Sequence, residues 1–306
     1  MEKLSFVVSA EESGLQVKKL IRSKYHLSAR MMTKIKYGDL ISVNGKREPG
    51  YFVVSEGDSV IVSIPDEKSR FEPEDIPISP IYEDEDFLII NKQAGVTVHP
   101  TKGHPDHTMA NGIMKYMLDT NQSFKVRFVN RLDMDTSGVL VIAKNSMVQA
   151  DLNRQMMEGS TTKEYLAVVS GNVENDSFTI DLPIGAPEPG EIGRRVVSNG
   201  DEGFPSQTDV TVLQRSTFDS KEYSLLRLRL LTGRTHQIRV HLSHIGHAIL
   251  GDPLFGGDMS FINRQALHAE RFLCTHPLKS APLDVRAPLP IDITELLDKL
   301  GFSFPS

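Results

Sequence analysis

Beyond Ile81 the chain is a succession of short apolar runs separated by turns rich in glycine, proline and aspartate. The clearest runs cover residues 87–90, 138–143, 165–169 and 224–231. Runs of this length between turn residues are typical of β-strands. Helical patterns are few, and residues 293–300 predict one terminal amphipathic helix. We therefore expect an α+β domain.

The first part of the chain has a different pattern and a strong positive charge. Between residues 13 and 38 there is no acidic residue, and apolar side chains recur at helical spacing, which predicts two short helices. Residues 39–46 and 59–64 then predict strands, the first running into an Asn44-Gly45 turn. The basic residues of this small α/β unit are Lys18, Lys19, Arg22, Lys24, Arg30, Lys34 and Lys36.

A charged, proline-bearing stretch separates these two patterns. Residues 65–80 show no periodicity, so we interpret them as a linker. The predicted division is an N-terminal domain of residues 1–69 and a larger domain of residues 70–306.

Charge and cysteine content exclude several classes of protein. A formal net charge of -6 argues against a protein that coats nucleic acid indiscriminately. The single cysteine, Cys274, excludes an internal disulfide and a zinc site built on paired cysteines. The chain has no run of 18 apolar residues and does not begin like a signal peptide. We expect a cytoplasmic monomer without a membrane span or an obligate protein partner.

The segment of residues 129–144 carries the most chemical information. A polar loop rich in arginine and aspartate leads directly into an apolar strand, and Asp133 lies just before that strand. A carboxylate held at a rigid strand edge can act as nucleophile or base. The alternative is an Asp-rich turn in which Asp133 or Asp135 caps backbone amides.

This loop, Asn130-Arg-Leu-Asp-Met-Asp-Thr-Ser-Gly138, resembles the HRLDxxTSG signature of the RluA/RluD family of RNA pseudouridine synthases. Further blocks similar to that family follow in the same order, at residues 82–100, 162–165, 231–239, 265–268 and 276–277. The resemblance implies the pseudouridine synthase fold, with a mixed, mainly antiparallel central sheet and an active-site cleft. The N-terminal unit resembles the RNA-binding module first seen in ribosomal protein S-four.

The resemblance also implies roles for single residues. Asp133 corresponds to the catalytic aspartate, and Arg234 to the arginine paired with it. Tyr165 corresponds to the aromatic residue that stacks on the flipped base, and Arg131 to the arginine that takes the place of the extruded uridine. Unstacking a base costs roughly a few kcal/mol, which such contacts offset. Further RNA contacts are expected from Asn130, Lys92, Lys18, Lys19, Arg22, Arg30, Lys34 and Lys36.

Two positions depart from the family pattern. Asn130 stands where the best-known members carry histidine, and Gln93 stands where proline usually follows the lysine. Since the mechanism uses neither the histidine nor the proline, we expect altered loop packing or substrate contacts and retained chemistry.

The histidines His236, His241, His244 and His247 suggest a metal site at first sight, but their spacing has no HExxH pattern and the segment offers no carboxylate ligand. We expect instead a helix over residues 235–245 that leaves the histidines and Arg239 for surface or backbone contacts. The turn before it would aim Arg234 at the cleft. The glycine-rich residues 251–257 are interpreted as a structural loop, because they lack the spacing of a phosphate-binding loop.

The predicted reaction converts uridine to pseudouridine without metal or cofactor, because mass, charge and redox state do not change. Large-subunit (23S) ribosomal RNA is the expected substrate, with transfer RNA as the alternative. Two other functions stay open: an RNA glycosidase that uses Asp135 to activate water, and an inactive RNA-binding or ribosome-assembly factor.

Overall fold

The N-terminal elements form one small antiparallel sheet with two helices. The computed structural model describes residues 2–25, 27, 29–37, 39–64, 69–101, 103–186, 195–198 and 203–303. The sheet has the order β1 (Glu2–Val7), β4 (Ser59–Ile64), β2 (Ile41–Val43), β3 (Lys46–Arg47). A short 3-10 turn, Ala10–Glu12, precedes helices α1 (Val17–Tyr25) and α2 (Ala29–Tyr37). The two predicted helices are confirmed.

Local sequence explains this unit except for its first strand. The buried faces of α1 and α2 carry the apolar residues at helical spacing, among them Val17, Ile21 and Ile35. Asn44 and Gly45 both have positive φ, as a tight hairpin turn requires. β1 was not predicted, because its burial depends on pairing with β4, more than fifty residues away.

The segment predicted to be a linker is partly packed on the protein. Residues 65–68 lie outside the described residues, but residues 69–79 run in extended form along the next domain. Phe71, Ile76 and Ile78 pack against the main core, and the Asn111 side chain donates a hydrogen bond to the Glu72 carbonyl at 2.9 Å. The apolar residues between the prolines account for this attachment.

A nine-stranded sheet forms the centre of the rest of the chain. Its order is β5 (Pro80–Glu83), β6 (Phe87–Lys92), β7 (Ser137–Ala143), β14 (Leu267–Thr275), β8 (Thr162–Ser170), β13 (Lys221–Leu230), β12 (Gln207–Phe218), β9 (Ser177–Asp181), with β15 (Pro282–Arg286) beside β14. β7 and β14 are parallel, and the other paired strands of this sheet are antiparallel. The expected α+β fold with a mixed, mainly antiparallel sheet is confirmed.

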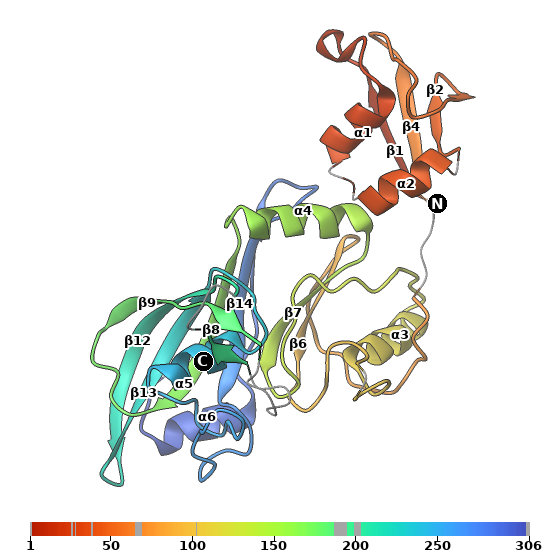
Figure 1. Ribbon diagram of the computed structural model, residues 1–306. Helices are drawn as coiled ribbons and strands as arrows, with labels where there is room; N and C mark the ends of the chain where they lie inside the picture. Colours follow the sequence, from red (N-terminus) through yellow and green to blue (C-terminus); the bar gives the residue numbers. More distant parts are fainter. Residues whose placement is uncertain are drawn as a thin grey trace.

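Helices cover separate parts of this sheet (Figure 1). α3 (Met109–Asp119) lies beside the β6–β7 half, whereas α5 (Gln237–His244) and α6 (Ile291–Lys299) lie beside the β12–β14 half. α4 (Ser146–Met157) runs between the sheet and the N-terminal unit, and its Met147 packs into the core of that unit. A two-stranded ribbon, β10 (Ile184–Gly185) and β11 (Val196–Val197), completes the described elements. No described helix has the length and apolar character needed to cross a membrane.

The parallel junction between β7 and β14 lies where the chain leaves the loop that contains Asp133. Gly138 has φ +115, and a Cβ added there would lie 2.2 Å from the carbonyl oxygen of Ala269. Only glycine allows the two backbones to approach this closely. The start of β7 is therefore fixed by backbone packing, which fixes the loop before it.

Candidate active site

Buried cations hold the main chain of the loop that contains Asp133. The Lys92 ammonium donates hydrogen bonds to the carbonyl oxygens of Met134 at 2.8 Å and Thr136 at 3.0 Å, and to that of Gln93 at 2.8 Å. Arg264 donates to the Asp135 carbonyl at 3.0 Å. Three consecutive loop carbonyls are thus bound by side chains from elsewhere in the fold.

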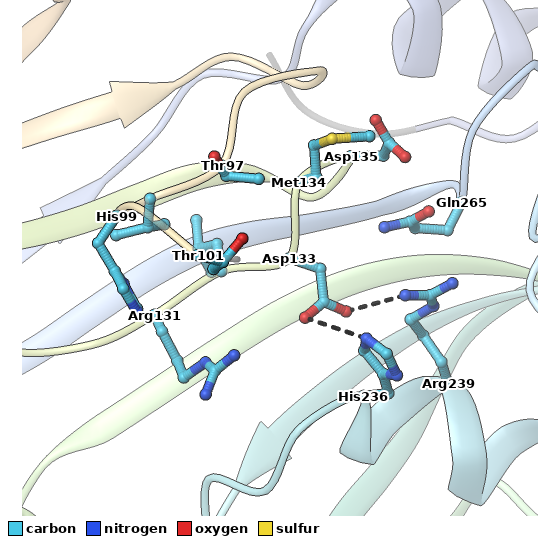
Figure 2. Close-up of a pocket in the computed structure, with 12 residues that line it drawn as sticks. Thr97, His99, Thr101, Arg131, Asp133, Met134, Asp135, His236, Arg239 and Gln265 are labelled. Carbon is cyan, nitrogen blue, oxygen red and sulfur yellow. Dashed lines mark hydrogen bonds and ion pairs between the residues drawn. The ribbon is translucent and has the colours of Figure 1, made fainter. Parts of the chain in front are cut away.

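Asp133 projects from this loop into a cavity of about 200 Å³ (Figure 2). Its Oδ2 accepts a hydrogen bond from Arg239 Nη1 at 3.1 Å, and its Oδ1 lies 3.9 Å from His236 Nε2. One carboxylate oxygen is therefore held by a cation, while the other has no hydrogen bond from the two side chains that flank it. This arrangement suits a nucleophile or base, and it differs from a carboxylate that caps backbone amides.

Arg239 is fixed in turn by a second carboxylate. Asp252 is fully buried and accepts from Arg239 Nε at 2.7 Å and Nη2 at 2.8 Å. Burial lowers the pKa of Arg239, but Asp252 and then Asp133 outweigh it, and the net pKa is raised. The guanidinium also lies over the Phe255 ring, 5.0 Å from its centroid. Arg239 is thus a permanently charged, oriented partner for Asp133.

The prediction that Arg234 pairs with Asp133 is wrong. The Arg234 guanidinium lies over the ring of Phe204, 5.4 Å from its centroid, and Nε donates to the Pro205 carbonyl at 3.4 Å. His236 has φ 57, so the chain turns once more before α5 begins at Gln237. That turn places Arg239, in the first turn of the helix, where Arg234 was expected.

One further expectation for this helix needs correction. Arg239 was expected to be free for surface or backbone contacts, but it is buried and bound by two carboxylates. His241 is also buried, yet it makes a backbone contact as expected, to the Leu182 carbonyl at 3.0 Å, and it lies 3.0 Å from Thr208 Oγ1. The sequence signal was present: Arg239 lies between Ile238 and Leu242 on the buried side, and Asp252 supplies the charge that such burial requires.

Lys92 and Asn130 do not offer their side chains to RNA in this structure. Lys92 is fully buried, and burial lowers its pKa to about 7. The Asn130 amide donates to the Val139 carbonyl at 2.9 Å and accepts from the Val141 amide at 2.8 Å. Both residues shape the loop, so the Asn130 departure has a role in loop packing. The Gln93 side chain likewise donates to the Pro77 carbonyl at 3.2 Å.

The side chains of Arg131 and Tyr165 differ in exposure. Arg131 is exposed and lines the cavity together with Asp133 (Figure 2). Tyr165, on β8, is 6% exposed, and its pKa is raised by burial and then by the charge of Asp133. Its ring is therefore near Asp133 but largely covered, and stacking on a base stays a prediction.

The basic residues of the N-terminal unit are mostly at its surface. Lys18, Lys19, Arg22 and Lys36 are exposed, and Lys34 is half-buried. The side chain of Arg30 lies outside the described residues.

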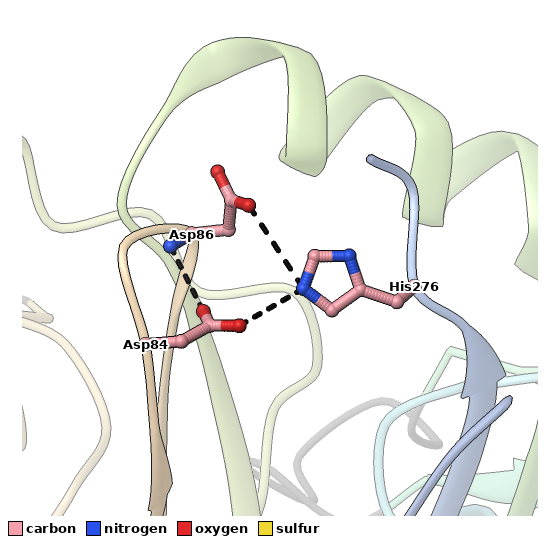
Figure 3. A group of neighbouring side chains, drawn as sticks. All are labelled: Asp84, Asp86 and His276. Carbon is pink, nitrogen blue, oxygen red and sulfur yellow. Dashed lines mark hydrogen bonds and ion pairs between the residues drawn. The ribbon is translucent and has the colours of Figure 1, made fainter. Parts of the chain in front are cut away.

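One cluster within the described parts of the chain has the composition of a metal site. Asp84, Asp86 and His276 bring their ligand atoms within 4.8 Å of one another (Figure 3). However, Asp84 Oδ2 already accepts from Lys279 at 2.6 Å and Tyr82 at 2.7 Å, and it lies 3.0 Å from His276 Nε2. The cluster is a hydrogen-bonded ion-pair network that ties the β5–β6 turn to the end of β14.

Comparison with known proteins adds to this geometry. A family model described as RNA pseudouridylate synthase matches residues 86–244, which include Asp133, Tyr165, His236 and Arg239. Among solved structures, human RNA pseudouridylate synthase domain containing 1 is 29% identical with a TM-score of 0.58, over 70% of this chain and 84% of that one. The human domain-containing 4 protein shares the fold at 21% identity and a TM-score of 0.61, over 74% of this chain and 95% of that one.

Curated relatives are similar over most of their length. YjbO of Bacillus subtilis, an uncharacterized RNA pseudouridine synthase, is 38% identical over 89% of this chain and 94% of its own. Ribosomal large subunit pseudouridine synthase D of Escherichia coli is 36% identical over 86% of this chain and 83% of its own.

Proposed function

Because this chain belongs to the RNA pseudouridine synthase family and is an isomerase that acts on RNA, we propose that it modifies uridines of large-subunit (23S) ribosomal RNA. Relatives from Escherichia coli and Haemophilus ducreyi that carry this ribosomal name support the choice of RNA. The observation that carries the chemistry is Asp133, held at one oxygen by Arg239 and facing the cavity with the other.

In the proposed mechanism a uridine leaves the RNA helix and enters the cavity. Asp133 acts at the ribose, either by attack on the anomeric carbon or by removal of a sugar proton, while the bond from ribose to the uracil nitrogen breaks. The uracil turns and rejoins through its carbon-5. Arg239 keeps Asp133 ionised and oriented through these steps.

The proposed RNA contacts surround this centre. Arg131, exposed at the rim, occupies the position left by the extruded base, and Tyr165 supports the base next to Asp133. The exposed lysines and arginines of the N-terminal unit, which we propose is an S-four-type module, bind the phosphate backbone. Catalysis needs no cofactor, since no atom is exchanged with another substrate.

Purified protein incubated with unmodified 23S transcripts tests the proposal, with pseudouridine mapped by chemical adduct sequencing. We expect product at defined uridines with the wild type and none with Asp133→Asn, which removes the charge but keeps the shape. Product formed by Asp133→Asn would contradict the role of Asp133. Product on transfer RNA transcripts alone would change the substrate and leave the mechanism standing.

The same reaction separates the remaining alternatives. A glycosidase would release free uracil, and it would need Asp135 to activate water beside the ribose. The Asp135 carboxylate is turned away from Asp133 in Figure 2, which favours isomerisation. An inactive RNA-binding factor would retain RNA binding but give no pseudouridine on any transcript.

A further inference from the structure

His236 is held in a strained conformation next to the reacting oxygen of Asp133. It is the residue before α5 and adopts φ 57 and ψ 19, a left-handed conformation that costs a non-glycine residue about 1–3 kcal/mol. The conformation directs the imidazole into the cavity, where Nε2 lies 3.9 Å from Asp133 Oδ1 (Figure 2). The ring packs edge-on against Phe255, 5.8 Å between centroids.

The imidazole has no fixed hydrogen-bond partner in the described structure. Its Nδ1 is buried without a partner, and 3.9 Å is too long for a hydrogen bond from Nε2 to Asp133. A buried polar atom left unpaired costs about 1–3 kcal/mol, so such atoms in a cavity point to a role in function. Neither ring nitrogen is committed to holding the fold.

Burial favours the neutral form of this ring, and charged groups on three elements face it. Burial lowers the pKa of His236, the carboxylate of Asp133 opposes this effect, and Arg239, Asp252 and Arg131 contribute in smaller measure. The ring also lies at the amino end of α5, where the helix dipole disfavours a cation. A neutral imidazole beside a carboxylate is a free base at neutral pH.

The isomerisation requires such a base. When carbon-5 of uracil bonds to the anomeric carbon, it still carries its hydrogen, which must leave as a proton before pseudouridine is formed. An atom bonded to the anomeric carbon comes within roughly 3–4 Å of the oxygen that acts on that carbon. The Nε2 atom of His236 lies 3.9 Å from Asp133 Oδ1, so the imidazole and carbon-5 are placed beside the same carboxylate.

Other titratable groups at the cavity are less suited to this step. Asp133 is engaged at the ribose, and the guanidinium groups of Arg131 and Arg239 stay protonated. His99 is exposed at the rim, and the carboxylate of Asp135 points away from Asp133 (Figure 2). His236 is the buried neutral base among the described residues of the cavity wall.

We propose that His236 is the general base that removes the carbon-5 proton of the rejoined uracil, an inference that rests on the proposed function. In this step the C5–H bond breaks, its electron pair restores the C5–C6 double bond, and the proton passes to Nε2. The uracil nitrogen takes up one proton after its bond to the ribose breaks, and carbon-5 gives up one proton in this step. The reaction is therefore balanced without a co-reactant. The carboxylate of Asp133, free again at this point, stabilises the imidazolium beside it.

The test compares wild type and His236→Asn on transcripts made with ordinary uridine or uridine deuterated at carbon-5, under single-turnover conditions. Asparagine adopts the left-handed conformation readily, so the backbone is retained while the base is lost. We expect pseudouridine formation to fall by about 10²–10⁴-fold. We also expect deuterium to slow the variant further, because loss of the carbon-5 proton becomes rate-limiting.

His244→Gln is the matched control, since His244 is exposed in the last turn of the same helix and should retain wild-type rates. A His236→Asn protein that is folded and as fast as wild type would overturn the proposal. A slow variant without an isotope effect would also overturn it, because that result fits a residue that only positions Asp133. The assay includes both ribosomal and transfer RNA transcripts. If the wild-type protein forms no pseudouridine on either RNA, the proposed function fails together with this step.

Discussion

At the scale of single residues, the role we propose for Asp133 depends on which cation is its partner. Arg239 is bound on one side to the buried Asp252 and on the other to Asp133, so its position is set before any RNA arrives. Arg234 lies in the turn outside this arrangement, against Phe204.

Arg239→Lys should therefore reduce the rate of pseudouridine formation by about a hundredfold, the usual effect of removing one oriented donor from a reacting centre. Lysine keeps the charge but cannot bind Asp252 and Asp133 in the same planar geometry. Single-turnover rates measure the effect, and thermal unfolding monitors the loss of a bond to Asp252. Arg234→Gln is the comparison, and a larger loss from Arg234→Gln than from Arg239→Lys would contradict the assignment.

The sequence drew attention to Asp133, which the structure places at the cavity, but it did not identify the partner of Asp133. The loop around Asp133 is a long contiguous signature, whereas the pairing with Arg239 depends on one left-handed residue, His236, that shifts the start of a helix. Asp252 was missed because its importance lies in burial, and the loop around it was interpreted only as a glycine-rich connection. Lys92 was assigned to RNA because a lysine in a polar segment is normally exposed.

At the scale of secondary structure, the junction of β7 and β14 is the most constrained contact. Gly138→Ala should destabilise the protein by more than about 3 kcal/mol, because the added Cβ would overlap the Ala269 backbone and φ is positive. Urea unfolding measures the loss. Gly159→Ala serves as the control: φ is +70 there but nothing lies within 4 Å of the added Cβ, so about 1–2 kcal/mol is expected. Equal losses would show that the close approach to β14 is unimportant.

The turn between β5 and β6 should make stability depend on pH. Burial raises the pKa of Asp84, but hydrogen bonds from Lys279, Tyr82 and His276 outweigh it, and its pKa lies well below the usual range. The folded protein therefore holds fewer protons than the unfolded chain at low pH. The stabilisation is complete above pH of about 4 and is lost as the pH falls below that value.

Asp84→Asn should lower the free energy of unfolding by about 2 kcal/mol at pH 7, the scale of a hydrogen bond to a charged group. The difference from wild type should shrink as the pH is lowered to about 3. Urea denaturation of wild type and variant at pH 7 and at a pH of about 3 gives the difference in the free energy of unfolding at each pH. A difference that stays constant with pH would mean that the ionised carboxylate is not what stabilises this turn.

Strands with their own apolar runs, such as β6, β7, β8 and β13, were predictable, and so were α1 and α2. Strands that are stabilised by pairing with distant segments were not predictable. β1 pairs with β4, and β14 pairs with both β7 and β8. The segment of residues 69–79 was taken for a free linker, because apolar residues spaced by prolines show their attachment only when α3 is in place.

At the scale of the whole molecule, the N-terminal unit meets the catalytic part through α4, where Met147 packs into its core. We propose that this unit provides affinity for the phosphate backbone and the larger sheet provides chemistry. If so, substitutions in the N-terminal unit should change RNA affinity, and substitutions in the larger part should change the rate of the reaction.

Replacing Lys18, Lys19 and Arg22 together with glutamine should weaken RNA binding and reduce the slope of log Kd against log salt by about 2, because fewer counterions are released. The single-turnover rate at saturating RNA should not change. Filter binding at several salt concentrations measures the slope. Lys115→Gln is the control, since Lys115 pairs with Asp119 on α3. An unchanged slope in the triple variant would place the main phosphate contacts elsewhere.

The way the Asp133 loop is held has an evolutionary consequence. Lys92 and Arg264 bind carbonyl oxygens of residues 134–136, and every amino acid brings an identical carbonyl to such a position. The exposed side chains of Arg131 and Met134 can therefore drift by mutation while the loop keeps its shape. A lineage can in this way acquire new target preferences at the rim without first losing its catalyst.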